Sequence, residues 1–542
     1  MDAITSTPVP RNEPARSYAP ESPERGMLTR RLAQLSGERA ELTLTIGGRQ
    51  RMAAGQPFDV VAPHRHAHVL GRCAQATGAD VADAVRAAED AAPAWRDLPF
   101  DERAAVILRA ADLLSGPWRD TLNAATMLGQ SKSVQQAEIE AACELADFWR
   151  FNVAYARRIL AEQPNSVPGE WNRMDYRPLD GFVTAITPFN FTAIAANLPT
   201  APALMGNTVV WKPTPTQQLA AHYTMRLLEA AGLPPGVINL VTGDGAAVSE
   251  VALSDPGLAG LHFTGSPRTL QLLWRTVAEH LDRYRAYPRI VAETGGKDFV
   301  VAHPSADRSA VATALVRGAF EYQGQKCSAV SRAYLPRSLW GGGLRDELAD
   351  RTATISYGDI ADLSHFGGAV IDARAFAKHR DLLDRVATDP SLEVLAGGGC
   401  DDEVGYFVSP TVLVGADPKH EVFATEYFGP ILAVYVYDDG DYRDILDLVD
   451  ATSPYALTGG VFATDRTALE QAQAALRFAA GNFYVNDKPT GSIVGRQPFG
   501  GSRGSGTNDK AGSLFNLQRW VSPRAIKETF DPPTDHSYPH MR

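Results

Sequence analysis

The chain has 542 residues, of which 44% are hydrophobic and 21% are charged, as in ordinary globular proteins and unlike disordered or collagen-like chains. Its 63 acidic and 52 basic residues give a net charge of −11, which argues against a nucleic-acid partner because such a groove needs a basic face. No apolar stretch approaches the roughly 18 residues that span a bilayer, so no membrane partner is expected. The length predicts roughly three to four domains.

The cysteines and the N-terminus indicate the compartment. Four cysteines lie far apart without a CxxC pair or a Cys/His cluster, so neither a disulfide framework nor a metal site is predicted. Free thiols fit a reducing compartment. Residues 1–26 contain acidic residues and several prolines but no apolar segment typical of a secretion signal. We therefore expect a cytoplasmic protein with an N-terminal extension, residues 1–40, whose start is poorly ordered or loosely packed.

Helical patterns come first along the chain, and strands follow. Apolar residues at helical spacing predict helices over residues 80–95, 101–114 and 133–160. Short β-branched runs at 181–187 and 208–211 predict strands. From residue 216 to 269 helices alternate with further strands, at 237–241 and 260–263. Such alternation predicts an α/β fold with a parallel sheet and right-handed crossovers.

The turns after these strands predict a binding crevice. Ligands of parallel α/β sheets bind beyond the carboxyl ends of the strands. The segments expected to face one crevice are 187–191, Lys212, 243–245 and 265–269. A second α/β stretch follows residue 291, with strands at 299–301 and 432–437, and a glycine-rich segment, 491–506, closes it.

Three side chains stand in positions that suit chemistry. Cys327 follows a helical run, 311–322, among glycine and small residues that let other groups approach its sulfur. Glu293 ends an apolar run beside two glycines, where a carboxylate can act as a general base. Asn190 follows a predicted strand, and its amide could stabilise an oxyanion. Taken singly, each has a plainer interpretation: a packed cysteine, a surface carboxylate and a turn residue.

Read in order, the motifs resemble the aldehyde dehydrogenase superfamily. The matching blocks are ITPFNF (186–191), WKP (211–213), FTGS (263–266), ETGGK (293–297), GQKCS (324–328), EYFGP (426–430) and PFGG (498–501). The resemblance extends from about residue 40 to the C-terminus. Within the superfamily the chain is most similar to the branch that oxidises L-glutamate γ-semialdehyde, through the blocks FNFTAIAANLPTAPALMGNTVVWKP, AETGGKDFVV, FEYQGQKCSA and TGSIVGRQPFGGSRGSGTNDKAG.

The resemblance implies an architecture. It comprises a Rossmann-type NAD-binding domain (41–169 and 181–294), a second α/β catalytic domain (295–510) and a small β oligomerisation flap (170–180 and 511–542). A flap strand that pairs with a neighbouring subunit would remove an exposed edge, so a homo-oligomer is expected.

The resemblance also implies roles for residues. Cys327 would attack the aldehyde, and Asn190 with the Cys327 backbone N–H would hold the oxyanion. Glu293 would activate water to release L-glutamate from a thioester. The residues expected at NAD are Thr187, Lys212, Gly265, Ser266, Pro267, Arg268, Thr269 and Glu426. Those expected at the substrate are Ser492 and Gly491 at its α-carboxylate and Phe191 and Phe499 beside its aliphatic part.

One departure and several alternatives accompany this assignment. Many members carry a glutamate that binds the ribose 2′-hydroxyl where this chain has Pro215, so NAD rather than NADP follows from the branch alone. The activity would be the second step of proline catabolism, with a possible functional link to a separate proline dehydrogenase. The alternatives are an aldehyde dehydrogenase for another acidic semialdehyde, such as succinate semialdehyde, and a non-catalytic protein that keeps the fold.

Overall fold

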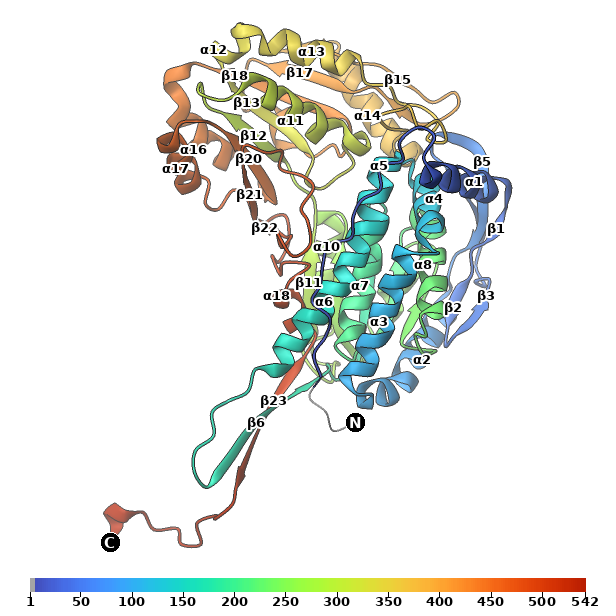
Figure 1. Ribbon diagram of the computed structural model, residues 1–542, viewed down its shortest axis with the longest axis vertical. Helices are drawn as coiled ribbons and strands as arrows, with labels where there is room; N and C mark the ends of the chain where they lie inside the picture. Colours follow the sequence, from blue (N-terminus) through green and yellow to red (C-terminus); the bar gives the residue numbers. More distant parts are fainter. Residues whose placement is uncertain (1–4) are drawn as a thin grey trace.

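The computed structural model describes residues 5–542 and contains two seven-stranded sheets (Figure 1). The first sheet has the order β11-β10-β7-β8-β9-β2-β3. Its central pairs, from β11 to β9, are parallel, while β2 and β3 add an antiparallel edge. The strands are β2 (Leu44–Ile46), β3 (Arg49–Arg51), β7 (Phe182–Thr187), β8 (Thr208–Pro213), β9 (Ile238–Leu240), β10 (Leu258–Thr264) and β11 (Arg289–Glu293).

The order of the first sheet creates a binding position. The chain runs outward from β7 through β8 to β9, then crosses to β10 and β11 on the other side of β7. The direction therefore reverses between β7 and β10, and ligands of doubly wound sheets bind outside the carboxyl ends of the strands at such a point. The α/β class and the parallel pairing predicted from the sequence are confirmed.

The second sheet has the order β14-β17-β18-β13-β12-β20-β21 and is parallel except for its edge strand β14. All its strands fall within residues 295–510: β12 (Asp298–Ala302), β13 (Val330–Pro336), β14 (Leu392–Ala396), β17 (Thr411–Gly415), β18 (Ile431–Tyr437), β20 (Thr458–Phe462) and β21 (Asn482–Val485). One face packs on α14 (Ala373–Val386) and α16 (Tyr442–Thr452), and the other on α11 (Arg308–Phe320).

Helices cover the first sheet and join it to the second. The predicted helices are observed as α2 (Gly78–Asp97), α3 (Phe100–Ser115) and a continuous run made of α5 (Val134–Ala137), a π-helical segment (Glu138–Glu144) and α6 (Leu145–Ala161). Sequence analysis missed α4 (Arg119–Gln130), which is buried along almost its whole length, including polar residues such as Asn123 and Gln130. These helices pack with α7 (Thr192–Leu204) and α8 (Gln218–Ala230). No helix among residues 5–542 is long and apolar enough to cross a membrane.

The expectation of a loosely packed start is wrong for residues 5–40. The helix α1 (Pro23–Gly37) buries three leucines, Leu28, Leu32 and Leu35, against α4. The segment before it runs beside α6 (Figure 1) and makes hydrogen bonds to the helices that it crosses. Polar side-chain contacts rather than an apolar pattern hold this segment, so periodicity could not reveal it.

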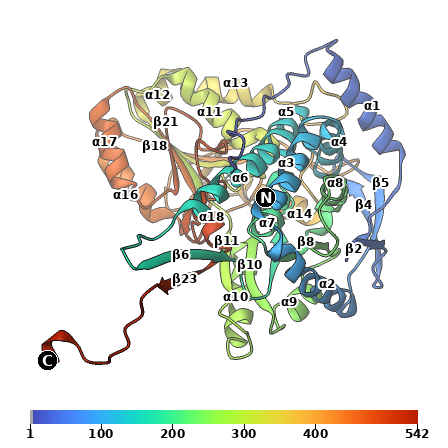
Figure 2. The ribbon, with the colours of Figure 1, turned by 60° about the horizontal axis from the view of Figure 1, so that its bottom comes forward.

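A ribbon of two antiparallel strands projects from the body of the molecule (Figures 1 and 2). It consists of β6 (Glu170–Arg177) and β23 (Ser522–Thr529), paired from Ser522 with Arg177 to Thr529 with Glu170. Both strands fall within the residues predicted to form the flap, 170–180 and 511–542. Two large apolar side chains at the ribbon, Trp171 and Phe530, are 51% and 64% exposed.

Candidate active site

Polar side chains gather where the strands of the first sheet end. Thr187, Lys212, Thr264 and Glu293 lie at or next to the carboxyl ends of β7, β8, β10 and β11. Parallel register brings these ends together, with Thr264 opposite Glu293 and Ile186 opposite Lys212. The strand ends at which the sequence predicts a crevice therefore lie along one edge of the sheet.

Lys212 gives this crevice a buried cation. Its side chain is 4% exposed, and burial lowers its pKa to about 8. The negative charge of Asp244 raises this pKa, but by less than burial lowers it. No ion pair to Lys212 is found among residues 5–542. A Cβ at Gly245 would lie 3.9 Å from the Lys212 Nζ, so the ammonium faces a backbone of minimal bulk. A buried ammonium in this setting fits the hydroxyls of a dinucleotide ribose.

The first turn of α10 (Pro267–Glu279) supplies backbone donors at the same edge. The N–H of Gly265 donates to the Glu293 carbonyl, the N–H of Thr269 donates to the Ser266 hydroxyl, and Pro267 has none. Ser266 and Arg268 contribute the remaining N–H groups of the predicted stretch, at a helix N-terminus that favours phosphate. Thr187 lies deeper, because its side chain is fully buried and its hydroxyl accepts a hydrogen bond from Trp211.

Glu426 lies between the crevice and the second sheet. Its carboxylate accepts a hydrogen bond from the Gly296 N–H at 2.9 Å, and burial raises its pKa. Lys378 and Lys297 lower that pKa by their charge. A carboxylate held near two cations stays able to accept hydrogen bonds from a ribose, as the resemblance implies.

The nucleophile loop, residues 321–328, joins α11 to β13 in a tight bend. Tyr322, Gln323 and Gly324 adopt left-handed backbone angles, with φ of 50°, 52° and 64°. A Cβ at Gly324 would lie 2.2 Å from the Gly429 carbonyl oxygen, so only glycine fits there. The Gln323 amide donates to the carbonyls of Ser131 and Ala369, which fixes the bend to two other segments. The fold thereby fixes the backbone that carries Cys327.

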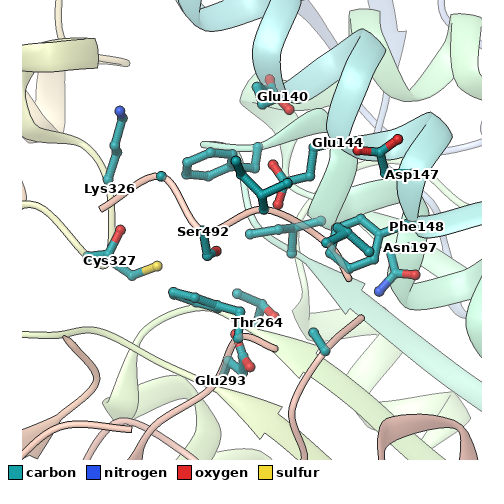
Figure 3. A pocket seen from close by; sticks show the side chains of 18 of the residues that line it. Glu140, Glu144, Asp147, Phe148, Asn197, Thr264, Glu293, Lys326, Cys327 and Ser492 are labelled. Atoms are coloured by element: carbon teal, nitrogen blue, oxygen red, sulfur yellow. The ribbon is translucent and has the colours of Figure 1, made fainter. Parts of the chain in front are cut away.

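Cys327 presents its sulfur to a cavity that is also lined by the ends of β10 and β11, by α6 and by the loop of residues 488–496 (Figure 3). Burial raises the pKa of its thiol, and the negative charge of Glu293 raises it further. Of the other three cysteines, Cys73 and Cys400 do not line the cavity; Cys143 does, but on the helical wall, where its thiol donates to the Glu138 carboxylate and burial raises its pKa. Cys327 is thus the cysteine suited to act on a bound aldehyde.

Asn190 supports the same loop. It lies between β7 and α7, is 4% exposed, and donates its amide to the Gln325 carbonyl at 3.0 Å. An amide NH₂ has two hydrogens, so one remains for a developing oxyanion beside Cys327. The structure therefore brings Asn190 and Cys327 together, although 137 residues separate them in the chain.

Glu293 faces the same cavity from the end of β11. Burial raises its pKa to about 8; the charge of Lys510 lowers it and that of Asp509 raises it. A Cβ added at Gly500 would lie 3.0 Å from the Glu293 carboxylate, so the glycine leaves room for this side chain. A carboxyl with a pKa near neutrality suits a general base.

The cavity has a volume of about 350 Å³, and Cys327, Glu293 and the predicted substrate residues all line it. Ser492 extends into it opposite the thiol (Figure 3). Gly491 has a φ of 91°, which glycine allows freely and which turns the backbone at this point. The other predicted substrate residues in the lining are Phe191 and Phe499.

Sequence analysis missed the acidic wall of this cavity. Glu144 and Asp147 lie on the side away from Cys327 (Figure 3), and Glu140 lines the wall as well. Burial raises the pKa of Glu144 to about 8, and the charges of Glu140 and Asp147 add to the rise. The signal was visible as carboxylates at residues 140, 144 and 147, a spacing that places them on one helical face.

A positive group stands nearer the thiol. Lys326 lines the cavity and forms an ion pair with Glu321, with Nζ and Oε2 2.9 Å apart. No group of three or more His, Cys, Asp or Glu side chains suited to hold a metal ion was found across residues 5–542.

Comparison with known proteins identifies the family of the chain. The family model described as "Aldehyde dehydrogenase family" matches residues 51–526. The chain belongs to the aldehyde dehydrogenase family. The mitochondrial delta-1-pyrroline-5-carboxylate dehydrogenase of Bos taurus is 48% identical over 532 residues, 98% of this chain and 94% of its own length.

Solved structures of aldehyde dehydrogenase family members agree. The crystal structure of the Delta-pyrroline-5-carboxylate dehydrogenase from Mycobacterium tuberculosis bound with NAD has 64% identity and a TM-score of 0.97, covering 100% of both chains. The structure of proline utilization A from Bdellovibrio bacteriovorus matches 97% of this chain and 54% of its own length, with 28% identity and a TM-score of 0.91. The predicted family and fold class are confirmed.

Proposed function

We propose that the protein oxidises L-glutamate γ-semialdehyde, the open form of Δ1-pyrroline-5-carboxylate, to L-glutamate with NAD. The observation that carries this proposal is one cavity that holds a thiol, a buried carboxyl and a polar turn: Cys327, Glu293 and Gly491–Ser492. The relatives named for this activity cover nearly the whole chain, and one of them is a structure bound with NAD.

Cys327 and Glu293 prepare the attack as a coupled pair. The charge of Glu293 disfavours a second negative charge on the thiol, so the thiol proton passes to the carboxylate as the sulfur attacks the aldehyde carbon. The Asn190 amide and the Cys327 N–H then stabilise the oxygen that becomes negative. NAD, when bound, accepts a hydride from this carbon and leaves a thioester on Cys327.

Glu293 completes the reaction by hydrolysis. Once it has passed the thiol proton to solvent, Glu293 takes a proton from water; the hydroxide attacks the thioester carbon, and the carbon–sulfur bond breaks to release the carboxylate product and the Cys327 thiolate. The crevice that holds Lys212 and the first turn of α10 binds the dinucleotide. Burial raises the pKa of Glu293 to about 8, so this base is only partly ionised at neutral pH.

The cavity suits a substrate with two opposite charges. The Ser492 hydroxyl and the backbone at Gly491 offer hydrogen-bond donors to an α-carboxylate. Glu144 offers a carboxylate to an α-ammonium, and that cation would offset the burial that raises the Glu144 pKa. Both charged groups of the substrate are on the α-carbon, and Phe191 and Phe499 line the cavity beside the aliphatic chain that leads from that carbon to the aldehyde. Succinate semialdehyde, the main alternative, has no ammonium and would leave Glu144 without a partner.

The test is NADH formation with Δ1-pyrroline-5-carboxylate, succinate semialdehyde and propanal at matched concentrations. We expect the highest kcat/KM with the first, because it alone fills both charged positions. Equal or better turnover of succinate semialdehyde would reject the substrate but keep the Cys327 mechanism. Absence of turnover with every aldehyde would support a non-catalytic protein instead.

Assembly, location and metabolic partner belong to the same proposal. The projecting β6–β23 ribbon, with Trp171 and Phe530 exposed, supports a homo-oligomer in which a second subunit covers it. The match to proline utilization A over about half of that chain supports a functional link to a separate proline dehydrogenase. The cytoplasmic location stays a prediction, and the Bos taurus relative is named as mitochondrial.

A further inference from the structure

We infer that Asn12 is a positioning residue for the loop that binds the substrate carboxylate, and that the N-terminal strap, residues 5–18, is therefore a working part of the active site. The inference deepens the proposed function, because it rests on the roles of Gly491 and Ser492. The anchor loop, residues 488–497, carries both of them and contains no helix or strand. A hydrogen-bonded turn closes residues 493–497, where the Ile493 carbonyl accepts from the Arg496 and Gln497 N–H groups, so the position of Gly491 and Ser492 relative to the rest of the site comes from contacts with other segments.

Asn12 joins the anchor loop to α6. Its amide Nδ2 donates to the Val494 carbonyl at 2.8 Å and to the Asp147 carboxylate at 2.8 Å. The two hydrogens of the amide are thereby both used. Within residues 5–542, the Val494 carbonyl accepts a hydrogen bond from Asn12 and from no other group. Val494 comes two residues after Ser492. The direction of the peptide just beyond the carboxylate site therefore depends on Asn12.

The rest of the strap holds Asn12 in place. The Glu13 N–H donates to the second oxygen of Asp147 at 2.7 Å, and the Glu13 carboxylate forms ion pairs with Arg119 at 2.6 Å and Arg150 at 2.7 Å. Arg119 is 2% exposed, so Glu13 supplies charge to a buried cation.

A second buried charge fixes the strap further along. Glu138 is fully buried and accepts hydrogen bonds from the Arg16 N–H at 2.7 Å and from the Tyr18 hydroxyl at 2.8 Å. Arg119, Asn123 and the Cys143 thiol also donate to it. An ionised carboxylate without these donors would be costly to bury, so the strap is bound strongly to the helices that it crosses.

The other end of the anchor loop is fixed from the nucleophile side. Ser328, next to Cys327, donates its hydroxyl to Thr490 at 2.9 Å, and Lys488 donates to the Thr490 carbonyl at 2.8 Å. Gly491 and Ser492 thus lie between an attachment to the nucleophile loop and an attachment to the N-terminal strap. The first sets the distance of the carboxylate site from the thiol, and the second sets its distance from the acidic wall.

The experiment compares Asn12→Ala with the wild-type enzyme on three aldehydes. Removal of one amide that bridges two segments predicts a rise of about three- to tenfold in KM for Δ1-pyrroline-5-carboxylate. The kcat, the KM for NAD and the kcat/KM for propanal, which has no carboxylate, should each stay within about twofold. In a Ser492→Ala background the Asn12→Ala change should add less than about twofold, since both act on the same contact.

Asn165→Ala is the matched control, because Asn165 is an exposed asparagine remote from the cavity. It should behave as wild type. An unchanged KM in Asn12→Ala, or an equal loss with propanal, overturns the positioning role, and the unfolding temperature shows whether the variant is folded. The KM of the variant is divided by that of the wild type for each carboxylate-bearing aldehyde that the wild type uses. This ratio tests the role of Asn12 whichever of these aldehydes is preferred, whereas the preference of the wild type alone tests the proposed substrate.

Discussion

The nucleophile loop and the anchor loop border one cavity but are held in different ways. The nucleophile loop is held in a tight bend by three left-handed residues, one of which, Gly324, lies where a side chain would collide with the Gly429 carbonyl, and by the Gln323 amide, which binds two backbone carbonyls. The anchor loop has a hydrogen-bonded turn at its far end, residues 493–497, and the part that carries Gly491 and Ser492 lies between contacts to Ser328 and Asn12. The position of the sulfur thus rests on a constrained backbone bend, whereas recognition of the substrate rests on single side-chain contacts to other segments.

The largest effect expected from this comparison is the loss of the nucleophile. Cys327→Ala should lower kcat by roughly 10⁴-fold or more, because the thiol that forms the covalent intermediate is lost. Binding of NAD, measured by calorimetry, should stay intact, since the crevice is separate from the thiol. Cys400→Ala is the matched control and should retain full activity. Substantial turnover by Cys327→Ala would refute the nucleophile assignment.

The pH dependence of turnover should report the ionisation of Glu293, the proposed general base. Burial raises the pKa of Glu293 to about 8, so most of it is protonated at pH 7 and the active, deprotonated form grows as pH rises. The kcat limited by hydrolysis should therefore rise about tenfold per pH unit below pH 8 and level off above it. Glu293→Gln should lose about 10²- to 10⁴-fold and this dependence with it. Asp509→Asn should move the midpoint to lower pH, because the Asp509 charge raises the Glu293 pKa.

The bend of the nucleophile loop can be broken without touching the reacting groups. Gly324→Ala adds a Cβ that would lie 2.2 Å from the Gly429 carbonyl oxygen, at a φ of 64°. We expect it to lower the free energy of unfolding by about 2 kcal/mol and to lower kcat as Cys327 shifts. Denaturant titration and initial rates test both effects. Gly440→Ala, where a Cβ meets nothing within 4 Å, should change neither.

The smallest effect is expected at the anchor loop. Ser492→Ala should raise KM for Δ1-pyrroline-5-carboxylate about tenfold and leave kcat nearly unchanged, because the lost hydrogen bond acts on binding. Steady-state kinetics with propanal provides the control, since this aldehyde has no carboxylate to lose. A fall in kcat with KM preserved would show that the anchor loop also takes part in the chemical step, and the distinction between the two loops would fail.

The sequence was most informative where function fixes residues locally. Cys327, Glu293 and Asn190 lie in short blocks whose order along the chain indicated the family, and strands β7 and β8 were visible as short β-branched runs. Such features depend on neighbours in the chain, so they can be read without a structure. The left-handed bend at Tyr322 and Gln323 could not be, because neither residue is a usual choice for positive φ and contacts from distant segments impose it.

The features missed by sequence analysis depend on contacts between distant segments. Glu144 faces the cavity because its helix is buried on nearly every side, whereas a lone glutamate suggests solvent. The N-terminal strap has no apolar periodicity, and its order comes from partners such as Asp147 and Glu138 more than 100 residues away. Such pairings between charged and polar groups leave no pattern in a single sequence.

The hydrogen bond between Asn12 and Val494 also bears on how the chain folds during its synthesis. It closes a loop of 482 residues, while the β6–β23 ribbon joins strands about 345 residues apart. During synthesis the first sheet can assemble from the early part of the chain, because all its strands are complete by Glu293. The substrate-binding end must wait until residues near both termini have left the ribosome and met. A newly made chain is therefore expected to acquire its cofactor crevice before it can recognise its substrate.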